Sequence, residues 1–290
     1  NKTLAFSFTG GNVSSTSGRN INHIQNDIRS ITITINSTNI KSTTPIILSS
    51  HLDSHATTTG SYDDGINVAL MISLAAAIMK SNETIRQPIQ FIFLGSEEMG
   101  LHGSLQYVSK NNDLKGHILN MESFGRGRPF GLIWKAKKSS SVVRSFSRIK
   151  GSLIATFFTD ITKLKILNSR SDIDIYDQIG LTGGQTVFFG NPAVYHTLMD
   201  SDCSYSDFEY AGNQLLLPSI PEMMSTADDE EKDLVAFGIS PFVLLIDKSI
   251  YPIIVYTVSV IALTVTFLFN PQFNPASYLQ PLFTWFAISL

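Results

Sequence analysis

PIQFIFLGSEE, residues 88–98, contains the transition around which this chain is organised. Its apolar run, residues 88–95, is bounded by polar residues and is typical of a buried β-strand. The run ends in two adjacent carboxylates, Glu97 and Glu98, whose charges repel each other unless solvent or a cation lies between them. The strand therefore places two acidic side chains at one edge of a sheet.

Apolar segments of strand length and helix length alternate on both sides of this strand. We expect strands at residues 30–35, 44–50, 117–122 and 186–190, helices at 66–80 and 103–110, and a further helix and strand between 139 and 167. Strands that alternate with helices are typical of α/β proteins. The prediction is an α/β fold over residues 1–224, with a mixed, mostly parallel central sheet flanked by helices.

Composition excludes some classes of protein and partner. The 290 residues carry a formal net charge of −3, which does not suit binding to nucleic acid. The single cysteine, Cys203, excludes a disulfide framework within the chain. Four N-x-S/T triplets, at Asn1, Asn12, Asn36 and Asn82, are acceptors for N-glycosylation in a secretory compartment.

The C-terminal part of the chain predicts contact with a lipid bilayer. Residues 251–269 contain no charge, and a helix of this length approximately crosses a hydrocarbon core of about 30 Å. We expect a linker at 225–249, which includes an apolar stretch at 234–246 that is either interfacial or part of another span. Residues 250–290 form the predicted transmembrane region, with a second apolar segment at 277–290. The missing initial methionine indicates a fragment of a longer, multi-spanning protein.

Acidic side chains and a histidine follow several of the predicted strands. His51 and Asp53 follow one strand, Glu97 and Glu98 another, and Glu122 closes a third. Sites in open α/β sheets form outside the carboxyl ends of strands, so these side chains are expected to converge. A divalent metal relieves the repulsion, and imidazole with carboxylate and without thiolate suits zinc. Two metals that share a carboxylate activate a water, and a spare carboxylate then takes its proton.

Five motifs in a fixed order carry a family resemblance. They are H-x-D at 51–53, D-D at 63–64, E-E at 97–98, N-x-E at 120–122 and Y-H-T at 195–197. In this order the chain resembles the co-catalytic zinc aminopeptidase family, which includes bacterial leucyl aminopeptidases and glutamate carboxypeptidase. Within that family it is most similar to the endoplasmic reticulum metallopeptidase 1 and vacuolar membrane protease group, which shares the glutamate of the fourth motif.

The resemblance implies a role for each matching residue and two Zn²⁺ ions per domain. The implied metal ligands are His51, Asp64, Glu98, Glu122 and His196. His51 and Glu122 would hold one zinc and Glu98 and His196 the other, with Asp64 bridging the two.

Three further residues complete the implied site. Glu97 matches the general base, and Asp53 matches the residue that orients the imidazole of His51. Asp63 is the alternative to Asp64 as the bridging carboxylate.

Several neighbours of the motifs carry weaker expectations. His55 and His102 match no family ligand and are expected at the surface. Arg126 and Arg128 are expected to face solvent, with contact to a substrate carboxylate as the alternative. Tyr195 is either a packing residue or a hydrogen-bond donor to the reacting oxygen.

The expected function is that of a membrane-anchored zinc metallopeptidase, most simply an aminopeptidase that cleaves peptides. Its domain would lie on the luminal side of the endoplasmic reticulum or vacuole membrane, in a multi-pass protein. One alternative is a catalytically inactive peptidase-like scaffold in a membrane complex. Another is an enzyme like the glutaminyl cyclases, which bind a single zinc. All five ligands and the base are present, which favours the enzyme; oligomeric state and side-chain preference are not predicted.

Overall fold

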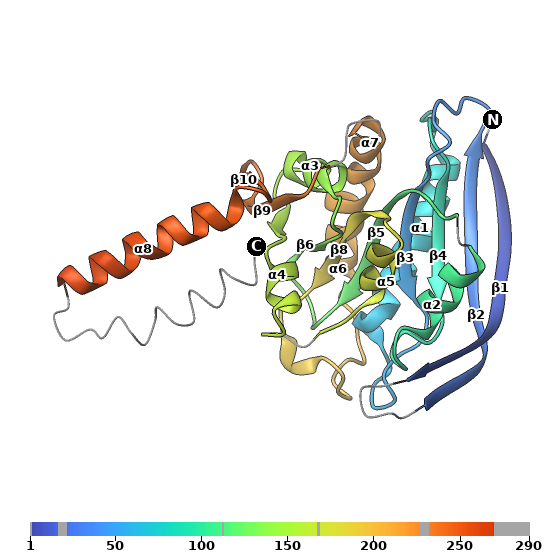
Figure 1. Cartoon of the computed structure of the whole chain (residues 1–290). Helices are drawn as coiled ribbons and strands as arrows, with labels where there is room; N and C mark the ends of the chain where they lie inside the picture. Colours follow the sequence, from blue (N-terminus) through green and yellow to red (C-terminus); the bar gives the residue numbers. More distant parts are fainter. Residues whose placement is uncertain (1, 17–21, 112, 167–168, 227–231, 270–290) are drawn as a thin grey trace.

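The computed structural model describes residues 2–16, 22–111, 113–166, 169–226 and 232–269. Ten strands of these residues form one sheet in the order β1-β2-β4-β3-β5-β8-β6-β7-β9-β10 (Figure 1). The strands are β1 (Lys2–Thr16), β2 (Asn22–Ser37), β3 (Ile46–His51), β4 (Ile89–Leu94), β5 (His117–Ser123), β6 (Phe130–Lys135), β7 (Leu153–Ala155), β8 (Thr182–Phe188), β9 (Leu234–Ile239) and β10 (Phe242–Asp247).

The sheet is parallel at its centre and mostly antiparallel at its margins. Strands β4, β3, β5 and β8 run parallel to one another. Strands β1 and β2 add antiparallel on one side, whereas β6, β9 and β10 introduce antiparallel pairs on the other. The predicted mixed α/β sheet is therefore confirmed, and its parallel part is the central four strands.

Helices cover both faces of the sheet. They are α1 (Asn67–Lys80), α2 (His102–Lys110), α3 (Ser140–Arg148), α4 (Phe158–Lys163), α5 (Asp172–Gln178), α6 (Tyr205–Glu209), α7 (Leu217–Thr226) and α8 (Tyr251–Phe269), with short turns η1 (Ser61–Ile66), η2 (Pro192–Val194) and η3 (Tyr210–Leu216). One apolar cluster lies under α1, α3 and α7, and a second lies under α2 and α5. Alternate residues of a strand point to opposite faces, so Leu48 joins the first cluster and Ile47 the second. Burial on both faces explains why apolar residues follow one another without alternation in Ile46–Leu48 of β3 and Phe91–Leu94 of β4.

Most predicted elements are present, and four strands, β1, β6, β9 and β10, were not anticipated. The strands predicted at 44–50, 88–95 and 117–122 are β3, β4 and β5, and that at 30–35 lies within the longer β2. β1 was missed because it is an edge strand with exposed apolar residues, among them Phe8, which is 78% exposed. β6 was missed because it follows an arginine-rich turn and resembles a loop in sequence.

Residues 234–247 depart from the predicted linker and span. They form the antiparallel pair β9–β10, and β9 joins the sheet through β7. The start of β9 is buried, from Leu234 to Ala236, while Phe237 and Phe242 are exposed. The sheet therefore continues beyond residue 224. Residues 227–231 of the predicted acidic link lie outside the described residues.

The helix α8 follows this hairpin and extends away from the sheet (Figure 1). By length and composition, one helix of the described residues, Ser61–Lys80, qualifies as a membrane span. Its most apolar window is 56% buried inside the fold, so it is a core helix. Tyr251–Ala262 qualifies as a shorter apolar helix. The apolar segment predicted at 277–290 lies outside the described residues.

Candidate metal centre

Strand register brings the polar strand ends together. His51 is the last residue of β3 and pairs with Leu94 of β4, so the GSEE turn begins at the same edge of the sheet. Ser49 pairs with Asn120 of β5, which places His51 level with Glu122 two residues further along. Parallel strands at equal register present side chains to the same face, so the imidazole and the carboxylate meet.

The first group of potential metal ligands surrounds His51. The Nε2 atom of His51 lies 3.2 Å from Asp63 Oδ1 and 3.3 Å from Glu122 Oε1. Ligand atoms of these three residues and of Asp64 all lie within 4.8 Å of one another, and all four residues are buried. The Nδ1 atom of His51 donates to the backbone oxygen of Asp53 at 2.9 Å, which leaves Nε2 as the ligand atom.

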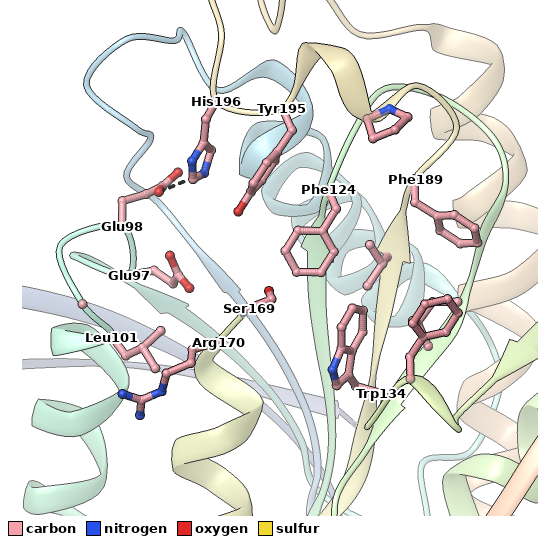
Figure 2. Close-up of a pocket in the computed structure, with 15 residues that line it drawn as sticks. Glu97, Glu98, Leu101, Phe124, Trp134, Ser169, Arg170, Phe189, Tyr195 and His196 are labelled. Carbon is pink, nitrogen blue, oxygen red and sulfur yellow. Dashed lines mark ion pairs between the residues drawn. The ribbon is translucent and has the colours of Figure 1, made fainter. Parts of the chain in front are cut away.

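The second group surrounds His196, which lies in the loop after β8. The Nε2 atom of His196 lies 3.1 Å from Glu98 Oε2 and 3.2 Å from Asp63 Oδ2. Figure 2 shows the His196 and Glu98 side chains facing each other across the mouth of a pocket. His196 has a left-handed backbone (φ 56°), which non-glycine residues seldom adopt. Asp63 is thus the one residue common to both groups.

The two adjacent aspartates have different surroundings. Asp63 directs one carboxylate oxygen toward each histidine. Asp64 instead accepts hydrogen bonds from Ser50 Oγ at 2.5 Å, from the His51 backbone N–H at 3.3 Å and from Asn67. Neighbouring residues in this non-helical turn point in different directions, so only Asp63 lies between the groups. The geometry therefore favours Asp63 over the expected Asp64 for the shared position.

Asp53 connects the ends of two strands. Its carboxylate accepts the backbone N–H groups of Glu97 at 3.0 Å and Glu98 at 3.1 Å. Its Oδ1 atom also lies 3.7 Å from Nδ1 of His51. The residue thus orients the imidazole, mainly through its backbone oxygen, and at the same time holds the turn that carries the two glutamates.

Burial and charge separate the protonation behaviour of the acidic groups. Burial raises the pKa of Glu97 to about 10, and the negative charges of Glu122 and Asp172 act in the same direction. Burial and the charge of Asp63 raise the pKa of Glu98 to about 7. Asp63 is the exception, because its two histidine contacts outweigh burial and lower its pKa to about 2. Without metal, Asp63 is therefore ionised and Glu97 keeps its proton at neutral pH; the positive charge of a bound metal would lower the pKa of Glu97 toward that of a general base.

The residues present fit a metal. Asp63 Oδ2, Glu98 Oε1 and His196 Nε2 are buried, and none has a hydrogen-bond partner within the described ranges of the chain. Buried polar atoms without partners are costly unless a ligand satisfies them. The donor set is imidazole and carboxylate, which suits zinc. All three atoms belong to the second ligand group, which is therefore a candidate cation site.

A polar network under Glu122 was not predicted from the sequence. Ser171 Oγ lies 2.9 Å from Glu122 Oε2 and 2.9 Å from the side-chain oxygen of Gln185, which Asn120 also contacts at 3.0 Å. All four side chains are buried. The signal that could have found one of them is the position of Asn120 within the N-x-E motif.

Three aromatic residues near the motifs differ in their surroundings. Tyr195 stacks on His196, with ring centroids 3.7 Å apart. His55 also stacks on His196, at 4.4 Å, and belongs to neither ligand group. The surface position predicted for His102 is wrong: this residue is 2% exposed, because α2 packs beneath the β1–β2 pair, where its Nδ1 contacts Gln25.

The two arginines after β5 form surface ion pairs. Arg126 NH2 lies 3.0 Å from Asp202, and Arg128 Nε lies 3.1 Å from Asp207. Both arginine side chains are more than one-third exposed, in accordance with the prediction that they face solvent.

A pocket of about 770 Å³ opens beside the two ligand groups (Figure 2). Glu97, Glu98 and His196 border one end of it. The other end is lined by apolar residues, mostly aromatic, from β6, α4 and the segments that follow β5 and β8.

Comparison with known proteins agrees with this geometry. The model of peptidase family M28 matches residues 31–208, more than half of the chain. A vacuolar membrane protease from Clavispora lusitaniae is 28% identical over 160 residues, which are 54% of this chain and 15% of that protein. The chain thus matches only about a sixth of that relative's length.

Two solved structures share the fold. The zinc aminopeptidase BSAP from Bacillus subtilis superposes with a TM-score of 0.52 at 21% identity, covering 69% of this chain and 52% of that one. The glutaminyl cyclase of Fimbriiglobus ruber superposes with a TM-score of 0.54 at 13% identity, covering 77% and 82%. The family match includes the ligand groups from His51 to His196 and confirms the resemblance found in the sequence: the chain belongs to peptidase family M28.

Proposed function

We propose that this domain is a two-zinc aminopeptidase. The observation that carries the proposal is the pair of ligand groups that share Asp63, with Glu97 beside them in neither group. His51, Glu122 and Asp63 would hold one ion, and His196, Glu98 and Asp63 the other. Bound zinc supplies the positive charge that acidifies water and polarises a carbonyl.

Glu97 is the residue that moves the proton. Its backbone N–H is held by Asp53. Its side chain lines the pocket next to Glu98 (Figure 2). Its carboxylate accepts a proton as the oxygen of water bonds to the peptide carbonyl carbon. It returns that proton to the amine nitrogen as the carbon–nitrogen bond breaks.

The amino terminus of a peptide suits the second ligand group. With zinc held by Glu98, His196 and Asp63, the free amine of the peptide would be a further ligand of that ion. The name of BSAP, a zinc aminopeptidase of the same fold, supports this choice of reaction.

The alternatives explain less of the geometry. A single-zinc enzyme related to glutaminyl cyclase would use one ligand group and leave the other orphaned. An inactive scaffold would need neither group nor the buried Glu97. The two groups instead form one connected set of buried ligands through Asp63.

The test is Glu97→Gln in the full chain, loaded with zinc, against peptides with free and with blocked amino termini. We expect turnover to fall by about 10²- to 10⁴-fold while two zinc ions remain bound. Glu83→Gln, an exposed glutamate, is the matched control. Unchanged turnover in Glu97→Gln refutes the mechanism, and no turnover by a wild-type protein that binds two zinc ions favours the scaffold.

We also propose that α8 spans a membrane, with the peptidase domain on the luminal side of the endoplasmic reticulum or vacuole. The helix has 19 residues, or about 28 Å, and most of its exposed side chains are apolar, such as Ile253, Val258 and Ile261. The name of the Clavispora lusitaniae relative refers to a vacuolar membrane.

The acceptor triplets test this orientation. Asn12 and Asn82 are exposed, whereas Asn36 is half-buried. A luminal domain should carry glycans that an endoglycosidase removes and that replacement of all four acceptors, at positions 1, 12, 36 and 82, by glutamine abolishes. The opposite outcome is a protein that carries no glycans and is cleaved in its exposed loops by a protease added to intact organelles. That result would place the domain in the cytosol. Microscopy then distinguishes the two membranes.

A further inference from the structure

The pocket beside the metal centre has two chemically different ends. Glu97, Glu98 and His196 form the polar end. The far end is lined by Phe124, Ile133, Trp134, Phe158, Val187 and Phe189. These residues come from β6, α4 and the segments around β5 and β8, which lie apart in sequence and meet here because β8 pairs with both β5 and β6. Figure 2 shows the rings of Phe124, Trp134 and Phe189 on the side opposite Leu101 and Arg170.

The aromatic wall is held in place by contacts among its own members. The Phe124 and Trp134 rings lie 5.2 Å apart and tilted, and Trp134 and Phe158 lie 6.0 Å apart. Trp134 Nε1 donates to Thr162 Oγ1 at 3.3 Å, so the one polar atom of the indole is satisfied within the protein. The wall therefore presents carbon atoms to the pocket, in a geometry that favours a further tilted or stacked ring.

The size of the pocket and the charge of its lining limit which side chains it can bind. A cavity of about 150 Å³ holds benzene, so about 770 Å³ accommodates an indole or phenyl ring together with neighbouring main chain. The aromatic end contributes no charged side chain among the described lining residues, whose one cation, Arg170, is exposed on the opposite side. A charged side chain placed against this wall would lose its hydration without a partner.

The position of the pocket next to the ligand groups relates it to the amino-terminal residue of a peptide substrate. In the proposed aminopeptidase Glu98 and His196 would hold a zinc ion, and the free amino group of the peptide would lie next to them, at the border of the pocket. The side chain of the same residue leaves the adjacent α-carbon and has the pocket as its nearest apolar space. We propose that this pocket selects peptides whose amino-terminal residue carries a large apolar, preferably aromatic, side chain. Trp134, Phe124 and Phe158 are the specificity-determining residues, and this inference rests on the proposed function.

The test uses the full chain loaded with zinc and two series of dipeptides. In one series the first residue varies among phenylalanine, tryptophan, leucine, alanine, lysine and glutamate before a constant alanine; the other series reverses the order. We expect kcat/KM to favour phenylalanine over alanine by about 100-fold in the first series only. Phe158→Ala should narrow that ratio at least about tenfold, because Phe158 is half-buried and borders the pocket. Phe208→Ala, a half-buried phenylalanine on α6 that lies outside the pocket, is the control.

Binding gives a second readout that is independent of turnover. In Glu97→Gln, the affinity for phenylalaninamide should exceed that for alaninamide at least about tenfold, and Phe158→Ala should remove the difference. Cleavage without ring preference, or with preference in the second position, overturns the pocket assignment and leaves the proposed function intact. A wild-type protein that cleaves no dipeptide overturns the proposed function, and the amide affinities then decide the pocket: equal values refute it.

Discussion

Asp63 and Asp64 are adjacent acidic residues for which the structure predicts different losses. The carboxylate of Asp63 lies 3.2 Å from the ligand nitrogen of each histidine. The carboxylate of Asp64 is already bonded to Ser50, Asn67 and a backbone N–H. Replacing either residue by asparagine removes one negative charge and keeps nearly the same shape. The comparison therefore isolates which carboxylate both metals share.

The magnitude follows from these contacts. Asp63→Asn removes a ligand from both ions, and losing one partner of a buried charged pair costs about 3–5 kcal/mol. At 1.4 kcal/mol for each factor of ten, zinc affinity should fall by about 10²- to 10⁴-fold at both sites. Asp64→Asn removes a residue that supports the ligands from behind, a change that typically costs about 10- to 100-fold in metal affinity.

The assay is zinc content by mass spectrometry after equilibration at a series of buffered free zinc concentrations. We expect wild type to bind two ions, Asp63→Asn to lose both over the range in which wild type is saturated, and Asp64→Asn to keep two at higher free zinc. The melting temperature without metal checks that each variant folds. If Asp64→Asn loses both ions while Asp63→Asn keeps two, Asp64 is the shared ligand and the reasoning from the carboxylate contacts is refuted.

Three further predictions concern the surroundings of the site. Ser171→Ala should weaken zinc binding at the Glu122 site about 10- to 100-fold in a metal titration. Ser171→Thr keeps the hydroxyl and should bind zinc with an affinity close to that of wild type. A loss of affinity in Ser171→Thr as large as in Ser171→Ala would show that the hydroxyl is irrelevant. Burial raises the pKa values of Glu98 and Asp172 to about 7, above unfolded values of about 4, so the folded metal-free chain binds protons more tightly than the unfolded chain. Its melting temperature should therefore fall from pH 5 to pH 8, and a rise would contradict this sign. Phe242 is 86% exposed in the hairpin before α8. In Phe242→Trp, we expect brominated lipid in nanodiscs to quench the fluorescence of the introduced tryptophan. Quenching by aqueous iodide alone would place residue 242 in water.

The strand ends of the site could be predicted because they depend on local pattern. β3, β4 and β5 are buried on both faces, so apolar residues follow one another in each strand, and acidic or histidine side chains occur at or just after the carboxyl ends. Parallel pairing then brings those ends to one edge, as the register of His51 with Leu94 shows. The crevice with His51, Glu98 and Glu122 follows from these two facts alone.

Other parts of the site depend on contacts that no local pattern reveals. Asp63 and Asp64 are chemically identical neighbours, and only the direction of each side chain in the turn separates their surroundings. Ser171 reaches Glu122 from 49 positions further along the chain. The aromatic wall requires β6, which was missed, to lie against β8. A pattern of spacing identifies residue types at strand ends, whereas these arrangements arise from tertiary packing.

The structure also explains why two adjacent glutamates follow β4. Asp53 accepts the backbone N–H groups of both residues, so the turn is held from the main chain and the two side chains are free to diverge. Glu98 turns to His196, 3.1 Å away, while Glu97 enters the pocket, where burial raises its pKa to about 10. A single longer strand would put successive side chains on opposite faces of the sheet. The turn instead keeps both glutamates at the same end of the pocket, where the proposed mechanism uses Glu98 to bind a cation and Glu97 to carry a proton.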